Sequence, residues 1–167
     1  NLADAANLED ALIGEDLERI DLSALIQSYL NNLNVVRPET NFIFQGTTNP
    51  IHVMVSDFRI EQLLDKLVDN ALDFASPDSP IVLSLNQSAS AVEFSLTNSG
   101  ATIPTDMLEA VFDSMISIRP GNPDNRLHFG MGLHVVRVIA EHHGGSVSIE
   151  NLTKPDGVKV SVNLPLA

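Results

Sequence analysis

The feature that most constrains this fold is an amphipathic helix predicted between Asp57 and Ala75. Apolar side chains recur there every three or four positions, which places them along one face of an α-helix. The stripe consists of Ile60, Leu63, Leu64, Leu67, Val68, Ala71, Leu72 and Ala75. Ser56 precedes it, and the polar, proline-containing segment 76–80 ends it. Because a helix with one apolar face must bury that face, a second layer of structure is required.

Segments that alternate apolar and polar residues predict the strands of that second layer. They lie at 41–47, 51–55, 81–87, 91–97, 146–150 and 158–164. The third and fourth segments form one hairpin and the last two another, so the sheet cannot be all parallel. Further helices are expected at 1–34, 105–112 and 130–143, with Gly14 interrupting the first and Asp21 capping its second part. We therefore predict an α/β (α+β) two-layer sandwich, a mixed β-sheet with helices packed on one face.

The composition suits a single folded domain and excludes several kinds of site. The 167 residues are 44% hydrophobic and include no cysteine, which excludes disulfides, a cysteine nucleophile and thiolate-bound metals. With 22 acidic against 9 basic residues, the net charge of −13 argues against nucleic acid as a partner. A phosphate ligand would have to meet a local cation cluster, a metal ion or backbone amides. No apolar run reaches the ~18 residues of a membrane span, and the N-terminus lacks a signal-peptide pattern.

Three segments contain the residue types of a nucleotide site. Lys66, Asn70 and Asp73 stand at i, i+4 and i+7, which aligns them along the predicted helix, and an asparagine there can offer an oxygen to Mg²⁺. The segment 97–104 follows a strand, and its glycine allows the backbone to approach a ligand closely. Residues 130–133, Gly-Met-Gly-Leu, open a helix whose free amides and dipole favour an anion. Each segment alone is also compatible with a solvated helix face or a tight turn.

The order and spacing of these segments resemble the ATP-binding catalytic domain of sensor histidine kinases, which is of the GHKL or Bergerat type. The similar segments are 59–74 (N box), 96–104 (first glycine box), 111–115 (F box) and 130–150 (second glycine box). Residues 1–20 resemble the end of a dimerisation helix and a connector, which leaves 21–167 as the catalytic domain. Segments 112–119 and 128–133 resemble, more loosely, the kinases of proteobacterial dedicated sortase systems.

The resemblance implies a pocket for Mg²⁺ and ATP between the long helix and a lid formed by 113–129. Asn70 would hold the Mg²⁺ ion, and Asn98 would face the adenine base. Arg119 and Lys66 would offset phosphate charge during catalysis. The implied ATP-binding residues are Lys66, Asn70, Asp73, Phe74, Asn98, Gly100, Thr102, Ile103, Arg119, His128, Gly130, Met131, Gly132 and Leu133.

The resemblance further implies that this chain is the catalytic fragment of a protein-histidine kinase, without the acceptor histidine. It would bind Mg·ATP and donate the γ-phosphoryl group to a histidine on a separate dimerisation domain of the same parent kinase. A response regulator would act downstream, the parent would be a homodimer, and no nucleic acid would be bound. The domain would be cytoplasmic, on a parent in the bacterial inner membrane.

At four positions the chain departs from the family pattern. They are Lys66, where the family usually has asparagine, Asp73 (lysine or arginine), Asn98 (aspartate) and Thr102 (glycine). Two alternatives stay open, and the four departures favour the first of them. One is a degenerate fold of the same type that serves for nucleotide binding or docking without kinase activity, and the other is a serine-directed kinase or ATPase of this fold.

Overall fold

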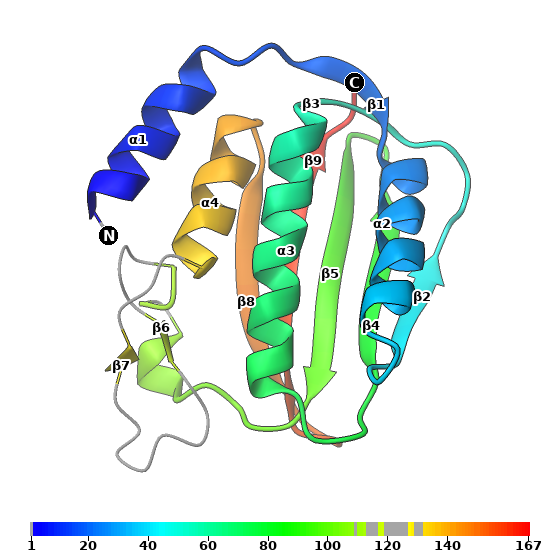
Figure 1. The fold of residues 1–167 in the computed structure, drawn as a ribbon, viewed down its shortest axis with the longest axis vertical. Helices are drawn as coiled ribbons and strands as arrows, with labels where there is room; N and C mark the ends of the chain where they lie inside the picture. Colours follow the sequence, from blue (N-terminus) through cyan, green and yellow to red (C-terminus); the bar gives the residue numbers. More distant parts are fainter. Residues whose placement is uncertain (1, 109, 113–116, 119–126, 129–131) are drawn as a thin grey trace.

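The amphipathic helix is α3 (Asp57–Phe74), and it lies in the middle of a helical layer that covers one face of a sheet (Figure 1). The computed structural model describes residues 2–108, 110–112, 117–118, 127–128 and 132–167. The buried side chains of α3 are Ile60, Leu63, Leu64, Leu67, Val68, Ala71 and Phe74. On either side of α3 lie α2 (Leu22–Val36) and α4 (Gly132–His142), and α1 (Leu2–Ile13) packs outside α4 (Figure 1). The predicted two-layer sandwich is confirmed.

The sheet beneath these helices has five strands in the order β2-β4-β5-β9-β8. Their bounds are β2 (Phe42–Gly46), β4 (Ile81–Gln87), β5 (Ala91–Ser99), β8 (Ser146–Leu152) and β9 (Gly157–Pro165). Strand β2 runs parallel to β4, whereas the other neighbouring pairs are antiparallel. The two predicted hairpins are therefore confirmed, and the sheet is mixed as expected.

Alternate side chains of the central strand β5 point into the helical layer, as the two-residue period of a strand requires. Val92, Phe94, Leu96 and Asn98 are each at most 2% exposed. Three of the four are apolar and form part of the hydrophobic core. Asn98, the last of the row, is a polar side chain placed in an apolar layer, so its neighbours decide whether it is a structural or a functional residue.

A second, small sheet corrects the expectation that residues 1–34 are helical throughout. Strand β1 (Glu18–Asp21) pairs antiparallel with β3 (His52–Val55), and neither strand joins the main sheet. The Asp21 carboxylate fixes the junction between β1 and α2. It accepts hydrogen bonds from the backbone N–H groups of Ala24 (3.3 Å) and Ile51 (3.1 Å). The predicted N-cap at Asp21 is confirmed, and the residues before it are held extended by a distant strand.

The helix expected at 105–112 is wrong beyond its first turn. Among the described residues of this segment only η1 (Thr105–Met107), a 3₁₀-helix, forms, because the stretch that follows Pro104 is too short to sustain an α-helix by itself. In the lid segment the structure describes β6 (Ser117–Ile118) and β7 (Leu127–His128), which pair antiparallel. The other lid residues lie outside the described ranges. None of the described helices is both long and apolar enough to cross a membrane.

Candidate functional site

Two of the predicted site segments meet at one end of the fold, and the third lies beside α3. The C-terminal end of α3 and the end of β5 lie at the lower end of the molecule in Figure 1, and α4 starts higher up, next to the middle of α3. Residues just after α3 pair with those at the end of β5, where the Ser76 N–H donates to the Ser99 carbonyl at 2.7 Å. The N box and the first glycine box, far apart in sequence, are thus neighbours in space, and the helix of the second glycine box packs against α3.

Gly100 is required by the close packing of the chain against the end of α3. Its φ is +144°, and a Cβ atom there would lie 2.2 Å from the carbonyl oxygen of Phe74. No side chain can be accommodated at that distance, so only glycine fits. In this structure Gly100 lets β5 and α3 come together. A direct contact between Gly100 and a nucleotide stays a prediction.

The loop after Gly100 is fixed by Asn151 of β8, a residue that the sequence did not single out. The Asn151 carboxamide accepts from the Ile103 N–H at 2.9 Å and donates to the Ile103 carbonyl at 2.7 Å. The Ile103 side chain is 1% exposed, whereas Thr102 beside it is exposed. A carboxamide that satisfies both polar groups of one residue fixes the position of the loop. No local pattern could have revealed a pair 48 residues apart.

Asn98 has the chemistry of a ligand-binding residue. Its side chain is 2% exposed, and its Nδ2 atom has no hydrogen-bond partner among the described residues. A buried donor without a partner costs about 1–3 kcal/mol, and such groups are rare in folded proteins. Asn98 therefore fits a polar ligand that supplies an acceptor at the end of β5.

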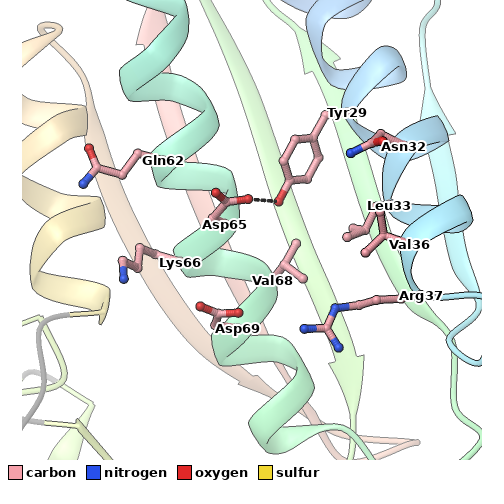
Figure 2. Close-up of a pocket in the computed structure, with 10 residues that line it drawn as sticks. All are labelled: Tyr29, Asn32, Leu33, Val36, Arg37, Gln62, Asp65, Lys66, Val68 and Asp69. Carbon is pink, nitrogen blue, oxygen red and sulfur yellow. Dashed lines mark hydrogen bonds between the residues drawn. The ribbon is translucent and has the colours of Figure 1, made fainter.

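The aligned polar residues of α3, Lys66, Asn70 and Asp73, form a polar line that begins at a groove between α2 and α3. This groove of about 510 Å³ is lined by residues that include Tyr29, Arg37, Asp65 and Lys66. The Tyr29 hydroxyl donates to Asp65 at 2.7 Å, and burial, together with that carboxylate, raises the pKa of Tyr29. Figure 2 shows Lys66 on the side of α3 nearer to α4, away from Tyr29. Lys66 therefore stands at the edge of the groove.

Asn70 and Asp73 continue this line from Lys66 toward the end of α3 at which the site segments meet. Asn70 is partly buried and Asp73 is exposed. Phe74 is 4% exposed and belongs to the core beneath them. The described residues include no group of three acidic or histidine side chains placed to hold a metal ion. A Mg²⁺ ion here would therefore depend on Asn70 and on oxygen atoms of its ligand.

The start of α4 offers free backbone amides and the positive end of the helix dipole. Gly132 is the first residue of α4 and Leu133 is buried, so the first backbone amides of the helix are held in place beside α3. The first amides of an α-helix lack partners within the helix and favour an anion. Nδ1 of His134 lies 3.1 Å from the carbonyl oxygen of Phe112 and so ties α4 to the segment that follows η1.

Comparison with known proteins identifies the family. Residues 56–167 match the family described as histidine kinase-, DNA gyrase B-, and HSP90-like ATPase. The chain belongs to this ATPase family. The sensor protein ChvG of Rhizobium meliloti is 27% identical over 166 residues, which cover 94% of this chain and 29% of ChvG. The predicted resemblance to the ATP-binding catalytic domain of sensor histidine kinases is confirmed.

Solved structures of this ATPase family have the same fold. The nucleotide-free catalytic domain of histidine kinase ThkA superposes with a TM-score of 0.74 at 25% identity, covering 90% of this chain and 98% of that one. ThkA in complex with the response regulator protein TrrA gives a TM-score of 0.73 at 23% identity, covering 99% of this chain and 47% of that one. The chain spans less than half the length of the first curated relatives it matches.

Several of the predicted ATP-binding residues cannot be placed in this ATPase domain. Arg119, Gly130 and Met131 lie outside the described residues, and of His128 only the backbone, in β7, is described. The remaining predicted residues lie on α3, on β5 and its following loop, and on the first turn of α4. In the structure α3 packs against both β5 and α4, and the contact of each residue with nucleotide stays a prediction.

Proposed function

We propose that this chain is the phosphoryl-donating domain of a two-component sensor kinase, with Mg·ATP bound along α3 between the end of β5 and the start of α4. The observation on which this depends most is Asn98, a buried amide whose Nδ2 has no partner among the described residues, in a domain of the ATPase family. An unpaired buried donor and a helix N-terminus on the two neighbours of α3 suit a ligand that has both a polar ring and an anionic group. A nucleoside triphosphate has both.

Within this proposal each element has a separate task. Asn98 and Thr102 face the base, while the amides of Gly132 and Leu133 at the start of α4 bind phosphate oxygens. Asn70 holds the Mg²⁺ ion, which would neutralise charge on the phosphates. Lys66 adds a cation to the same side of α3. Gly130, Met131, His128 and Arg119 complete the phosphate end in the proposal, with Arg119 contributing from the lid.

The catalytic contribution of such a site is positioning and charge neutralisation. A phosphoryl group in transfer gains little from covalent chemistry by the protein and much from fixed donors around its oxygens. The nucleophile is then the histidine of a separate dimerisation domain in the same parent kinase. Residues 1–20, which include α1, would be the end of that domain and its connector, and 21–167 the catalytic domain.

The remaining parts of the proposal concern the whole parent protein. The ThkA–TrrA complex supports a response regulator as the downstream partner. A homodimeric parent in the bacterial inner membrane, with this domain on the cytoplasmic side, is proposed from the sensor kinases among its relatives. The subtype of the sortase-associated kinases is proposed on the sequence of the lid and of the second glycine box alone.

Titration of the chain with ATP, with and without Mg²⁺, tests the function. Saturable binding of ATP that Mg²⁺ tightens, with no labelling of the chain itself by γ-labelled ATP, is expected. Labelling should appear when a dimerisation domain with its histidine is added. Absence of binding by the folded chain would favour the degenerate docking module. Hydrolysis of ATP or phosphorylation of a serine substrate by this chain alone would favour the ATPase or serine kinase.

A further inference from the structure

The unpartnered amide of Asn98 has an implication for which nucleotide base the site accepts. The backbone that carries the Asn98 side chain is rigid, because β5 is hydrogen-bonded to β4 on one side and to β9 on the other. Strand β9 also approaches Asn98 closely. A Cβ atom on Gly157 would lie 2.1 Å from the Asn98 carbonyl oxygen. The backbone at Asn98 is therefore held in place between β4 and β9.

The neighbours of Asn98 on its own sheet face offer no acceptor. The residues paired with it across the ladder are Ile81 on β4 and Val158 on β9, which are 1% and 0% exposed. Leu96 precedes it in the row that faces the helices. The Nδ2 group is thus surrounded on the sheet by apolar side chains, and none of the described residues accepts a hydrogen bond from it.

A carboxamide and a carboxylate differ in what they can pair with on a purine. A carboxylate only accepts hydrogen bonds, so it suits the amino group on carbon 6 of adenine and repels a carbonyl oxygen at that carbon. A carboxamide has a donor end and an acceptor end, which a half-turn about the Cβ–Cγ bond exchanges. One orientation accepts from a 6-amino group and donates to N1. The other donates to a 6-oxo group and accepts from N1–H.

We propose that Asn98 makes this domain tolerant of the group on carbon 6 of the purine, so that it binds 6-oxopurine triphosphates such as ITP about as tightly as ATP. This inference rests on the proposed function, in which the base of the nucleotide lies against Asn98. The site then selects a purine triphosphate by its phosphates, its metal ion and the shape of the ring. Whether carbon 6 has an amino or an oxo group contributes little to the choice, since Asn98 can hydrogen-bond to either one.

A ligand series on the unaltered 167-residue chain tests the inference without any variant. Dissociation constants are measured by calorimetry in Mg²⁺ for ATP (6-amino), ITP (6-oxo) and purine riboside triphosphate (6-hydrogen). We expect the values for ATP and ITP to agree within about threefold, and the 6-hydrogen analogue to bind about tenfold more weakly because it lacks one hydrogen bond. ITP binding more than about tenfold weaker than ATP would overturn the inference.

The variant Asn98→Asp tests whether the amide is responsible. A carboxylate cannot donate to a 6-oxo group, so the preference for ATP over ITP should rise to about tenfold or more. Asn31→Asp, which adds the same charge at an exposed position of α2, should leave the ratio of the unaltered chain unchanged. An unchanged ratio in a folded Asn98→Asp protein that still binds ATP would refute the role of Asn98.

The same measurements separate this inference from the proposed function. If the folded, unaltered chain binds none of the three triphosphates, the proposed function fails, and the inference fails with it. If the chain binds ATP and rejects ITP, the proposed function stands and the inference alone is overturned.

Discussion

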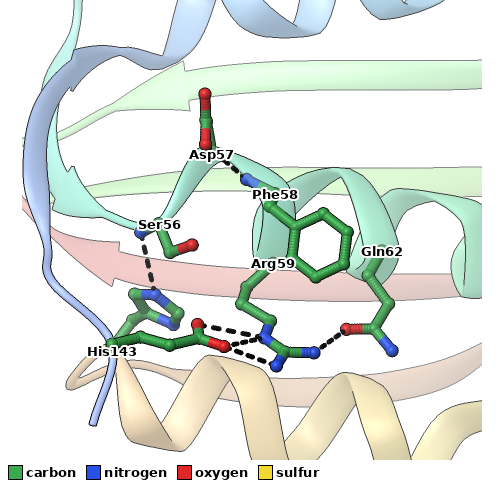
Figure 3. Close-up of polar contacts among 7 residues, drawn as sticks. Ser56, Asp57, Phe58, Arg59, Gln62 and His143 are labelled. Carbon is green, nitrogen blue, oxygen red and sulfur yellow. Dashed lines mark hydrogen bonds and ion pairs between the residues drawn. The ribbon is translucent and has the colours of Figure 1, made fainter. Parts of the chain in front are cut away.

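The backbone N–H of Ser56 donates to Nε2 of His143 at 3.2 Å and so ties the start of α3 to the end of α4 (Figure 3). Nδ1 of the same ring lies 2.7 Å from the Ile139 carbonyl oxygen. Because Nε2 accepts a hydrogen bond, the proton of the neutral ring is on Nδ1, which donates to Ile139. His143 is 5% exposed, and this burial lowers its pKa below the ordinary value for histidine.

Replacement of His143 by alanine should destabilise the fold by about 1–3 kcal/mol at pH 8, because it leaves the Ser56 N–H without its acceptor. The pH dependence should also change. The native ring binds fewer protons than the unfolded one, so its contribution is complete above the unfolded pKa of about 6.5 and is lost as pH falls below it. The variant should therefore show a flatter stability profile between about pH 7 and pH 5 in urea unfolding.

His142→Ala is the matched control for that prediction. The two rings are in edge-to-face contact with centroids 5.3 Å apart, but His142 is only partly buried. Its removal should leave the hydrogen bond between Ser56 and His143 in place and should preserve the fall in stability toward acid. An acid profile that flattens equally in both variants would show that the Ser56–His143 pair is not its source.

A second interaction joins the segment after α1 to the first turn of α3, through Glu15 and Arg59. Nε of Arg59 lies 2.7 and 3.0 Å from the two carboxylate oxygens of Glu15. The hydrogen bond from Arg59 lowers the pKa of the Glu15 carboxyl. Glu15→Gln should cost about 0.5–1 kcal/mol at pH 7, a size reduced by partial exposure to solvent.

The decrease in the free energy of unfolding caused by Glu15→Gln should disappear in acid. A carboxyl whose native pKa is lowered stabilises the fold above its unfolded pKa, near 4.3, and loses that contribution as pH falls through the native value. Urea unfolding at pH 7 and pH 3 measures the difference. Asp16→Asn removes the same charge at the adjacent, exposed position and should have little effect at either pH. Equal decreases in the free energy of unfolding for Glu15→Gln and Asp16→Asn at pH 7 would assign the effect to net charge.

The sequence predicted those parts of the fold that local periodicity determines. The apolar stripe of α3 and the alternation in β4 and β5 are visible within a few residues, and both were confirmed. Strand β1 could not be predicted, because Glu18 and its neighbours extend only by pairing with β3, more than 30 residues away. The same limit applies to Asn151 and to His143, whose partners are 48 and 87 residues distant.

For the candidate site, the sequence indicated which segments come together but not what each residue does there. Gly100 was expected to bring backbone close to a ligand; the structure shows its close approach to the Phe74 carbonyl, and its contact with a ligand stays a prediction. Asn98 was selected by its position in a motif, whereas its unpaired, buried donor becomes visible only once β4 and β9 are placed beside it.

Asn70→Ala tests the proposed metal contact. If the Asn70 oxygen holds Mg²⁺ against the phosphates, the variant should lose about tenfold or more in affinity for Mg·ATP, the size of one hydrogen bond to a charged group. Its affinity for metal-free ADP should change little. Asn34→Ala, at an exposed position of α2, should leave both affinities unchanged. Equal losses for Mg·ATP and metal-free ADP would show that Asn70 supports the structure of α3 and not the metal.

Lys66 and Asp73 test whether the departures from the family pattern preserve phosphate binding. Lys66 extends on the side of α3 nearer to α4 (Figure 2), and Asp73 lies seven residues further, about 10 Å along the helix axis. If Lys66 supplies a cation to the phosphates, Lys66→Ala should cost about 1–3 kcal/mol of ATP affinity, and the cost should shrink for adenosine, which has no phosphate. Asp73→Lys should leave ATP binding unchanged or tighten it.

The control for Lys66 is Arg37, a cation on the opposite wall of the α2–α3 groove. Arg37→Ala removes the same charge from the chain, so any effect of net charge on ATP affinity should appear equally in both variants. A selective loss in Lys66→Ala would place Lys66 among the residues that meet phosphate. If neither Lys66→Ala nor Asp73→Lys alters ATP affinity, Lys66 and Asp73 belong to a solvated helix face. A docking module would then explain the presence of these two residues better than a kinase site does.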